Sequence, residues 1–104
     1  MAYEARYVFR PNPGADLGAV MGAIKDGAAL WKRHGATDAR LWVVAAGEVG
    51  NYVLELRFDN ATEYARVTDP LSADPEFRKW QAANVQAGAF TWVRSNLLRE
   101  LPLA

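Results

Sequence analysis

The sequence predicts an α+β domain whose elements follow the order β-α-β-β-α-β. Three observations predict this class: four segments are typical of strands, apolar residues recur at helical spacing in two regions between them, and loops that contain glycine or proline separate the elements. The chain has 104 residues, of which 51% are hydrophobic and 12% aromatic. This length suits one domain and provides enough apolar bulk for a core, so we expect residues 1–104 to form a single domain.

The first two elements are a strand and a long helix. Residues 3–10 (YEARYVFR) alternate in polarity, and the following PNPGAD segment ends the strand. We expect the helix over residues 17–34, with Asp16 as its N-cap and Gly35 where the chain leaves it. Its apolar stripe consists of Leu17, Val20, Met21, Ile24, Ala28 and Trp31.

The middle of the sequence predicts an antiparallel hairpin. Residues 37–46 form its first strand, residues 51–58 its second, and Gly50-Asn51 has the chemistry of a turn. The first of these strands is apolar on both faces, with Leu41, Val43 and Ala45 on one and Trp42, Val44 and Ala46 on the other.

The last part of the chain predicts a broken helix and a final strand. Asn60 and Glu63 resemble a capping box, and we expect Pro70 and Pro75 to interrupt the helix. Asp74 then caps a new segment that has Pro75 at its first position. Residues 89–101 form the last strand. The complete order is that of a ferredoxin-like fold, in which a four-stranded antiparallel sheet carries two helices on one face.

The other face of this sheet is expected to be uncovered and apolar. Simple alternation places Trp92 and Leu98 on one face of the last strand, and Val93, Leu97 and Leu101 on the other. An exposed apolar face is an association surface, and a second copy of the chain is the simplest partner. We therefore expect a homodimer in which two sheets pack face to face.

Composition and charge argue against several other classes of function. Twelve basic and twelve acidic residues cancel, without a run of three cations, so no nucleic acid is expected as a partner. The absence of cysteine excludes disulfides, cysteine-based metal sites and a thiol nucleophile, and no histidine pair or acidic cluster indicates a metal site. Neither a signal peptide nor an 18-residue apolar segment is evident, so we expect a soluble, cytoplasmic protein without a membrane partner.

Three segments carry a likeness to a known superfamily: YEARYVFRPNPG, GNYVLELRFDNATEYARV and LSADPEFRKW. On these segments the chain resembles the dimeric α+β-barrel superfamily, most of all NIPSNAP-like proteins and more distantly the antibiotic-biosynthesis-monooxygenase type. The resemblance implies a dimer formed by paired sheets and a cavity between helices and sheet. Its members include cofactor-free oxygenases, haem-degrading enzymes, isomerases, cyclases, dehydratases and proteins without known activity, so the fold leaves the activity open. Haem-degrading members place their proximal histidine in the second helical region, and residues 60–87 contain none, so no cofactor is expected.

His34, the only histidine, ends the first helix at the border of its apolar stripe. As an imidazolium it would interact favourably with the last carbonyls of the helix, which is a purely structural role. Alternatively, it would be the catalytic proton-transfer group at the mouth of the cavity, with Tyr7 and Asn84 as orienting donors and Asp38 as a nearby carboxylate.

A set of aromatic and amide residues forms the candidate ligand-binding site. Its members are Tyr7, Trp31, Trp42, Tyr64, Trp80, Asn84 and Trp92. Large aromatic side chains either fill a core or line a pocket, whereas an amide that points at a core needs a partner or a ligand. We therefore expect a homodimer that binds a small hydrophobic or aromatic metabolite, with cofactor-free monooxygenase, isomerase or cyclase chemistry as its enzymatic form. The alternative is a non-catalytic NIPSNAP-like association protein, and the sequence leaves open whether the protein is an enzyme.

Overall fold

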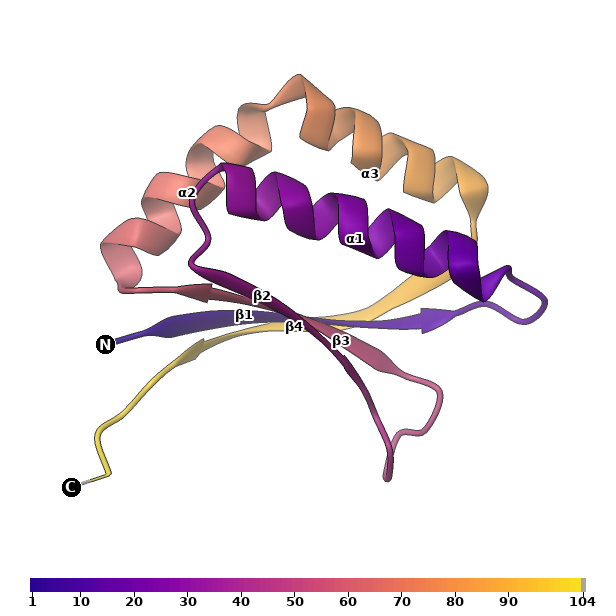
Figure 1. Ribbon diagram of the computed structural model, residues 1–104, viewed down its shortest axis with the longest axis horizontal. Helices are drawn as coiled ribbons and strands as arrows, with labels where there is room; N and C mark the ends of the chain where they lie inside the picture. Colours follow the sequence, from indigo (N-terminus) through magenta and orange to yellow (C-terminus); the bar gives the residue numbers. More distant parts are fainter. Residues whose placement is uncertain (104) are drawn as a thin grey trace.

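The computed structural model, which describes residues 1–103, has two layers, with three helices lying over one face of a four-stranded sheet (Figure 1). The elements are β1 (Tyr3–Pro11), α1 (Leu17–Arg33), β2 (Asp38–Val43), β3 (Tyr52–Phe58), α2 (Ala61–Ala73), α3 (Pro75–Ala87) and β4 (Phe90–Arg99). The strand order is β2-β3-β1-β4 and every neighbouring pair is antiparallel. The predicted ferredoxin-like α+β arrangement is confirmed, with the second helical region divided into α2 and α3.

Local signals in the sequence begin each helix. The Asp16 carboxylate accepts hydrogen bonds from the backbone N–H groups of Gly18 and Ala19, and the Asn60 side chain accepts one from Glu63. Asp74 ends α2 and begins α3, where its side chain accepts the N–H of Glu76. These side chains satisfy backbone donors that have no partner within the helix, which explains why the helices begin at these residues.

Pro70 does not interrupt the helix, so this part of the prediction is wrong. α2 continues through Pro70 to Ala73, and the break falls at Asp74. Proline removes the N–H that would bond to the carbonyl of Arg66, four residues earlier. Pro70 and Arg66 are both exposed, so water can hydrate this carbonyl and the helix tolerates the proline.

The hydrophobic core lies between α1, α2 and the two central strands. Phe9, Leu56 and Phe58 of the sheet are fully buried, as are Val20 of α1 and Val67 of α2. Edge strand β4, in contrast, is exposed from Thr91 to Arg99. The helices therefore cover the central strands closely and leave a hollow along β4.

The register of β4 places its side chains differently from the simple alternation predicted by the sequence. Ser95 pairs with Tyr7, but the register shifts by one residue between Val8 and Phe9, so that Trp92 pairs with Phe9. Because an extra residue in one strand reverses the alternation beyond it, Trp92 joins Ser95 and Leu97 on the helix-covered face, whereas Leu98 lies on the opposite face. The prediction that Trp92 and Leu98 share a face is therefore wrong.

The sheet face turned away from the helices, here called the outer face, combines charged and apolar side chains. The register places six charged residues together on its central part: Glu4, Arg6, Asp38, Arg40, Glu55 and Arg57. Nε of Arg6 donates to Glu55 (2.9 Å) and Nη1 of Arg57 donates to Glu4 (2.7 Å). Trp42 and Leu98 flank this network and are 50% and 38% exposed. The outer face is thus less uniformly apolar than expected.

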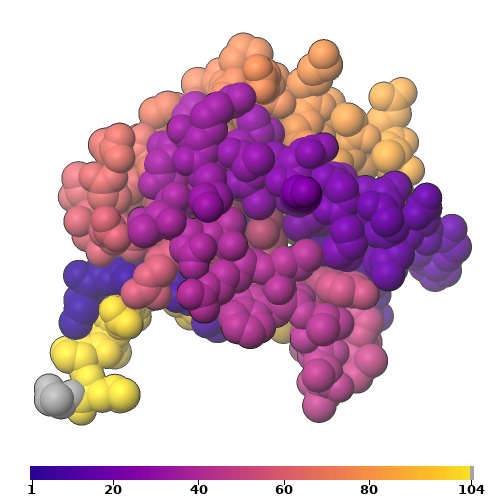
Figure 2. All heavy atoms as spheres, in the orientation of Figure 1, coloured from indigo at the N-terminus to yellow at the C-terminus, as the bar shows by residue number. Residues whose placement is uncertain are grey.

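Two segments project beyond the outer face. Figure 2 shows the β2–β3 hairpin and the C-terminal residues 100–103 extending on the same side of the molecule, with a hollow between them. Asn51 anchors the hairpin: it is 2% exposed, accepts from Nε of Arg10 (2.7 Å) and donates to Glu48 (2.9 Å). None of the helices within residues 1–103 has both the length and the apolar character needed to cross a bilayer.

Candidate functional site

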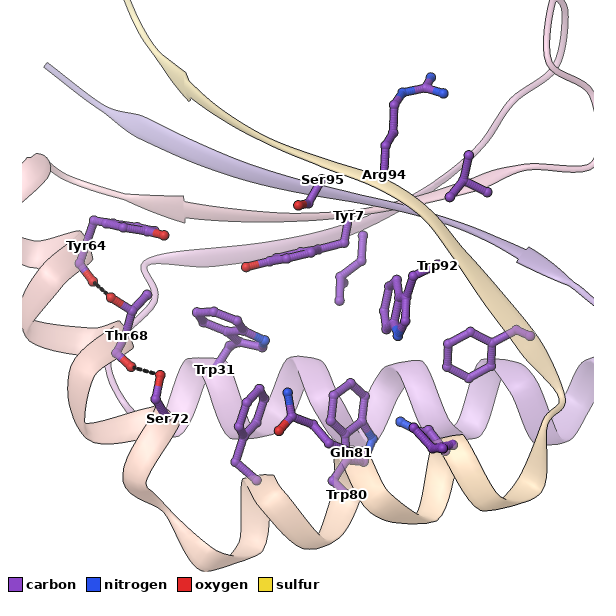
Figure 3. A pocket seen from close by; sticks show the side chains of 16 residues that line it. Tyr7, Trp31, Tyr64, Thr68, Ser72, Trp80, Gln81, Trp92, Arg94 and Ser95 are labelled. Carbon is purple, nitrogen blue, oxygen red and sulfur yellow. Dashed lines mark hydrogen bonds between the residues drawn. The ribbon is translucent and has the colours of Figure 1, made fainter.

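A cavity of about 640 Å³ opens between α2, α3 and the sheet, on the side of the sheet that carries β4. Figure 3 shows how it is built: Tyr7, Trp92 and Ser95 reach it from the sheet, Trp31 from α1, and Trp80 from α3. Tyr64, Thr68 and Ser72 follow one another at intervals of four residues along α2, so that they share one helix face. The cavity therefore lies where the helices leave the edge of the sheet uncovered.

Most of the predicted ligand-binding residues lie together in this cavity. Its lining includes Tyr7, Trp31, Tyr64, Trp80, Asn84 and Trp92. Trp42 lies elsewhere, because it pairs with Val53 on the outer face of the sheet. Residues 41–46 are apolar on both faces and did not separate Trp42 from the cavity residues, although Asp38 and Arg40 alternate onto the same face as Trp42.

Thr68, Ser72 and Ser95 also line the cavity but were missed in the sequence analysis. The signal for the first two was present, because they continue the helix face that begins at Tyr64. No such signal exists for Ser95, whose orientation depends on its pairing with Tyr7.

The apolar wall of the cavity is a network of aromatic rings. Tyr7 lies 5.8 Å from Trp31 and 6.1 Å from Trp92, measured between ring centroids. Trp31 contacts Phe77 edge to face at 5.9 Å, and Phe77 stacks on Trp80 at 5.6 Å. Such contacts restrict each ring and leave flat apolar surfaces toward the cavity.

Trp80 is held in place by α1. Its Nε1 donates to the carbonyl of Ala23 at 2.8 Å, and its six-membered ring lies against Gly27, where a Cβ atom would come within 2.3 Å of Cζ2. Gly27 therefore permits the close approach of α1 and α3. The indole N–H is used within the protein and is not available to a ligand.

The interior of the cavity is uncharged at neutral pH. Burial raises the pKa of Tyr7 to about 12, and the nearby Tyr64 adds to this effect, so the phenol stays neutral. Arg94 borders the cavity, but Figure 3 shows its side chain pointing away from it, and its Nη1 donates to Glu48 at 3.0 Å. The described residues contain no group of three His, Cys, Asp or Glu side chains that could hold a metal ion.

The cavity also contains hydroxyl and amide groups. The hydroxyl of Thr68 donates to the carbonyl of Tyr64, and that of Ser72 donates to the carbonyl of Thr68, both at 2.8 Å (Figure 3). Their oxygen lone pairs remain free to accept hydrogen bonds. Nδ2 of Asn84, in contrast, is buried and has no hydrogen-bond partner.

His34 lies outside the cavity lining and contacts a different carboxylate from the one considered in the sequence. Its Nε2 is 2.7 Å from Oδ2 of Asp74, whereas Asp38 accepts from Nε of Arg40 at 2.8 Å. The hydrogen bond from His34, followed by that from the backbone N–H of Glu76, lowers the pKa of Asp74. This contact joins the end of α1 to the α2–α3 junction.

No protein-family model matches the sequence, and no curated protein matches it. Solved structures, however, show the same α+β fold over the whole chain. A NIPSNAP family protein with unknown function from Agrobacterium tumefaciens is 19% identical, with a TM-score of 0.72, and the match covers 100% of this chain and 91% of that one. An uncharacterized NIPSNAP domain protein from Burkholderia xenovorans is 20% identical, with a TM-score of 0.70 and coverage of 100% and 98%.

A protein of known activity shares the fold as well. SnoaB from Streptomyces nogalater, a cofactor-independent oxygenase, is 14% identical, with a TM-score of 0.71 and coverage of 97% of this chain and 94% of that one. These neighbours belong to the groups that the sequence resembles, and they confirm the expected fold. Because they include both an oxygenase and proteins of unknown function, the likeness does not choose between an enzyme and an association protein.

Proposed function

We propose that this chain binds a small hydrophobic or aromatic metabolite in the cavity between its helices and its sheet. The observation that carries the proposal is an aromatic-lined cavity of about 640 Å³, which is in the range of small-molecule sites. Tyr7, Trp31 and Trp80 offer flat ring surfaces, while amide and hydroxyl groups can orient a ligand.

For the enzymatic form of this proposal we favour cofactor-free chemistry of the monooxygenase, isomerase or cyclase type. The likeness in fold to a cofactor-independent oxygenase supports this class. The pKa of Tyr7 is raised to about 12, so its phenol is neutral at pH 7. In this scheme the phenol serves as a hydrogen-bond donor to ligand oxygen. His34 has no place in this scheme, because it is engaged with Asp74 and does not border the cavity.

Binding of the neutral dye Nile red tests the proposal, because its fluorescence rises in an apolar site. Ser95→Trp would fill the cavity from β4, whereas Asn96→Trp adds the same side chain on the outer face, where Asn96 pairs with Arg6. We expect Ser95→Trp to abolish dye binding and Asn96→Trp to preserve it. Equal dye binding by both variants would show that the dye does not occupy this cavity.

We also propose that a second copy of the chain covers the outer face, as the sequence suggests. Trp42 and Leu98 are large apolar residues exposed on this face, and the alternating Glu and Arg side chains between them can pair with a rotated copy. The hairpin and the C-terminal residues would flank that copy (Figure 2). The same observations favour the second candidate function, a non-catalytic association protein whose sheet face is its working surface.

A further inference from the structure

One buried donor in the cavity wall has no acceptor. Asn84 borders the cavity. Among the described residues, its Nδ2 is the one buried side-chain polar atom without a hydrogen-bond partner. A buried amide N–H without a partner destabilises the free protein, and an acceptor supplied by a ligand would remove that penalty. Asn84 is only partly buried as a residue, so rotation about its Cβ–Cγ bond can turn the amide toward the cavity.

The helices also bring other polar groups to the cavity. Gln81 carries an amide and Tyr64 a phenol, but only Nδ2 of Asn84 is buried without a partner among the described residues. Nε1 of Trp80 donates to the carbonyl of Ala23, and the hydroxyl groups of Thr68 and Ser72 donate to backbone carbonyls of α2. These two hydroxyl groups therefore present acceptors, and Asn84 presents a donor. A ligand that binds Nδ2 of Asn84 must offer an oxygen or nitrogen lone pair, such as that of a carbonyl group.

The same cavity offers no cation to a charged ligand. Arg94 is the charged member of its described lining, but Figure 3 shows its side chain pointing away from the cavity. Its guanidinium group donates to Glu48 through Nη1 at 3.0 Å. The Tyr7 phenol is neutral, so no ionised side chain faces the interior. A carboxylate moved from water into this space would lose its hydration without gaining an ion pair.

We propose that the cavity is specific for uncharged, flat ligands with a carbonyl or similar acceptor, which the Asn84 amide binds, and that it rejects acids of the same shape. This inference rests on the proposed function, because it names the chemical class of ligand for the same cavity. The rings of Tyr7, Trp31 and Trp80 provide contact for the flat part of the ligand. Asn84 then selects among ligands of equal size by their hydrogen-bonding group.

Three probes of one shape test the proposal: 2-acetylnaphthalene, 2-isopropylnaphthalene and 2-naphthoate. Titration calorimetry at pH 7 gives their dissociation constants for the wild type and for Asn84→Leu, which replaces the amide with an apolar group of similar size. We expect the wild type to bind the ketone about tenfold more tightly than the hydrocarbon, and the naphthoate most weakly. Asn84→Leu should lose the preference for the ketone while binding the hydrocarbon at least as well.

Two controls test whether the Asn84→Leu variant is folded and whether its effect is specific to Asn84. Asn84→Leu removes an unsatisfied buried donor, so it should melt at or above the temperature of the wild type. Gln86→Leu makes the same kind of change at an exposed position of α3 outside the cavity lining and should leave the preference for the ketone intact.

The outcomes separate this inference from the proposed function. Equal affinity for ketone and hydrocarbon, a retained preference in Asn84→Leu, or tight binding of the naphthoate would overturn the role of Asn84 or the exclusion of acids, while the cavity would still be a binding site. Failure of the wild type to bind any of the three probes would overturn the proposed function itself.

Discussion

Trp80 lies so close to Gly27 that the helix has no room for a side chain there: a Cβ atom at Gly27 would be 2.3 Å from Cζ2 of the indole ring. This contact joins α1 to α3 and fixes one wall of the cavity. Phe77 stacks on Trp80 at 5.6 Å, and Nε1 of Trp80 is bonded to Ala23, so the indole has little freedom to move away from an added side chain.

Gly27→Ala should therefore destabilise the protein, although alanine is the better helix former. Overpacking of this kind costs about 1–3 kcal/mol, whereas the gain in helix propensity is at most about 1 kcal/mol. Thermal unfolding followed by circular dichroism would measure the difference. Gly22→Ala is the matched control, because Gly22 is exposed on the same helix with nothing within 4 Å of an added Cβ. A melting temperature for Gly27→Ala that equals or exceeds that of Gly22→Ala would contradict the prediction.

Asp74 should make the stability of the protein sensitive to acid. Its pKa lies below the ordinary value, mainly because His34 hydrogen-bonds to the carboxylate. A carboxyl group with a lowered pKa in the folded state stabilises the protein above its unfolded pKa, near about 4, and this contribution is lost as the pH falls through the folded pKa. We expect urea denaturation between pH 7 and pH 2.5 to show a weaker acid dependence for Asp74→Asn, which retains a helix-capping side chain.

Asp69→Asn is the control for this measurement, because Asp69 is exposed on α2 and makes no hydrogen bond or ion pair among the described contacts of its side chain. It should follow the pH profile of the wild type. Parallel profiles for Asp74→Asn and the wild type would refute the role assigned to the His34–Asp74 contact.

Tyr7 should make stability fall at high pH. Its pKa is raised from 10.0 to about 12 in the folded protein, chiefly by burial. A group with a raised pKa stabilises the folded state below its unfolded pKa, and this contribution disappears as the pH rises from 10 toward 12. The loss should reach roughly 2 kcal/mol and should be absent in Tyr7→Phe.

Ultraviolet titration near 295 nm, an absorbance typical of phenolate, together with melting curves above pH 9 would check this prediction. Tyr3→Phe serves as the comparison, because Tyr3 lies on the same strand face but outside the cavity lining. If Tyr3→Phe rather than Tyr7→Phe removed the late-titrating phenol, the assignment to Tyr7 would be wrong.

Trp42 should control the association of two chains. In the proposed dimer this side chain, 50% exposed in the single chain, is covered by the partner. Trp42→Glu would place a charge in that apolar contact, so we expect sedimentation velocity at micromolar concentration to show a dimer for the wild type and a monomer for the variant. Ala65→Glu, on the exposed side of α2, should remain a dimer. A monomeric wild type would exclude the dimer and, with it, the association function.

The sequence by itself determined the order of the elements and six of the residues that line the cavity. Asp16, Asn60 and Asp74 mark helix starts, because a capping side chain acts on backbone groups only two or three residues away. The aromatic and amide residues could be selected by residue type. Large aromatic rings either fill a core or line a pocket, and an amide that points at a core needs a hydrogen-bond partner. These signals are local, and a single sequence contains them completely.

Only the tertiary structure decided which of these residues meet. Trp42 and Trp92 have similar sequence settings, but strand pairing places Trp42 on the outer face and a one-residue register shift turns Trp92 into the cavity. His34 finds Asp74 across 40 positions of the chain rather than the nearby Asp38. The vacant hydrogen bond of Asn84 depends on every group packed around it. The physical reason is the same in each case: register, packing and hydrogen-bond satisfaction are set by residues far apart in the sequence, and they exist only after the helices have docked on the sheet.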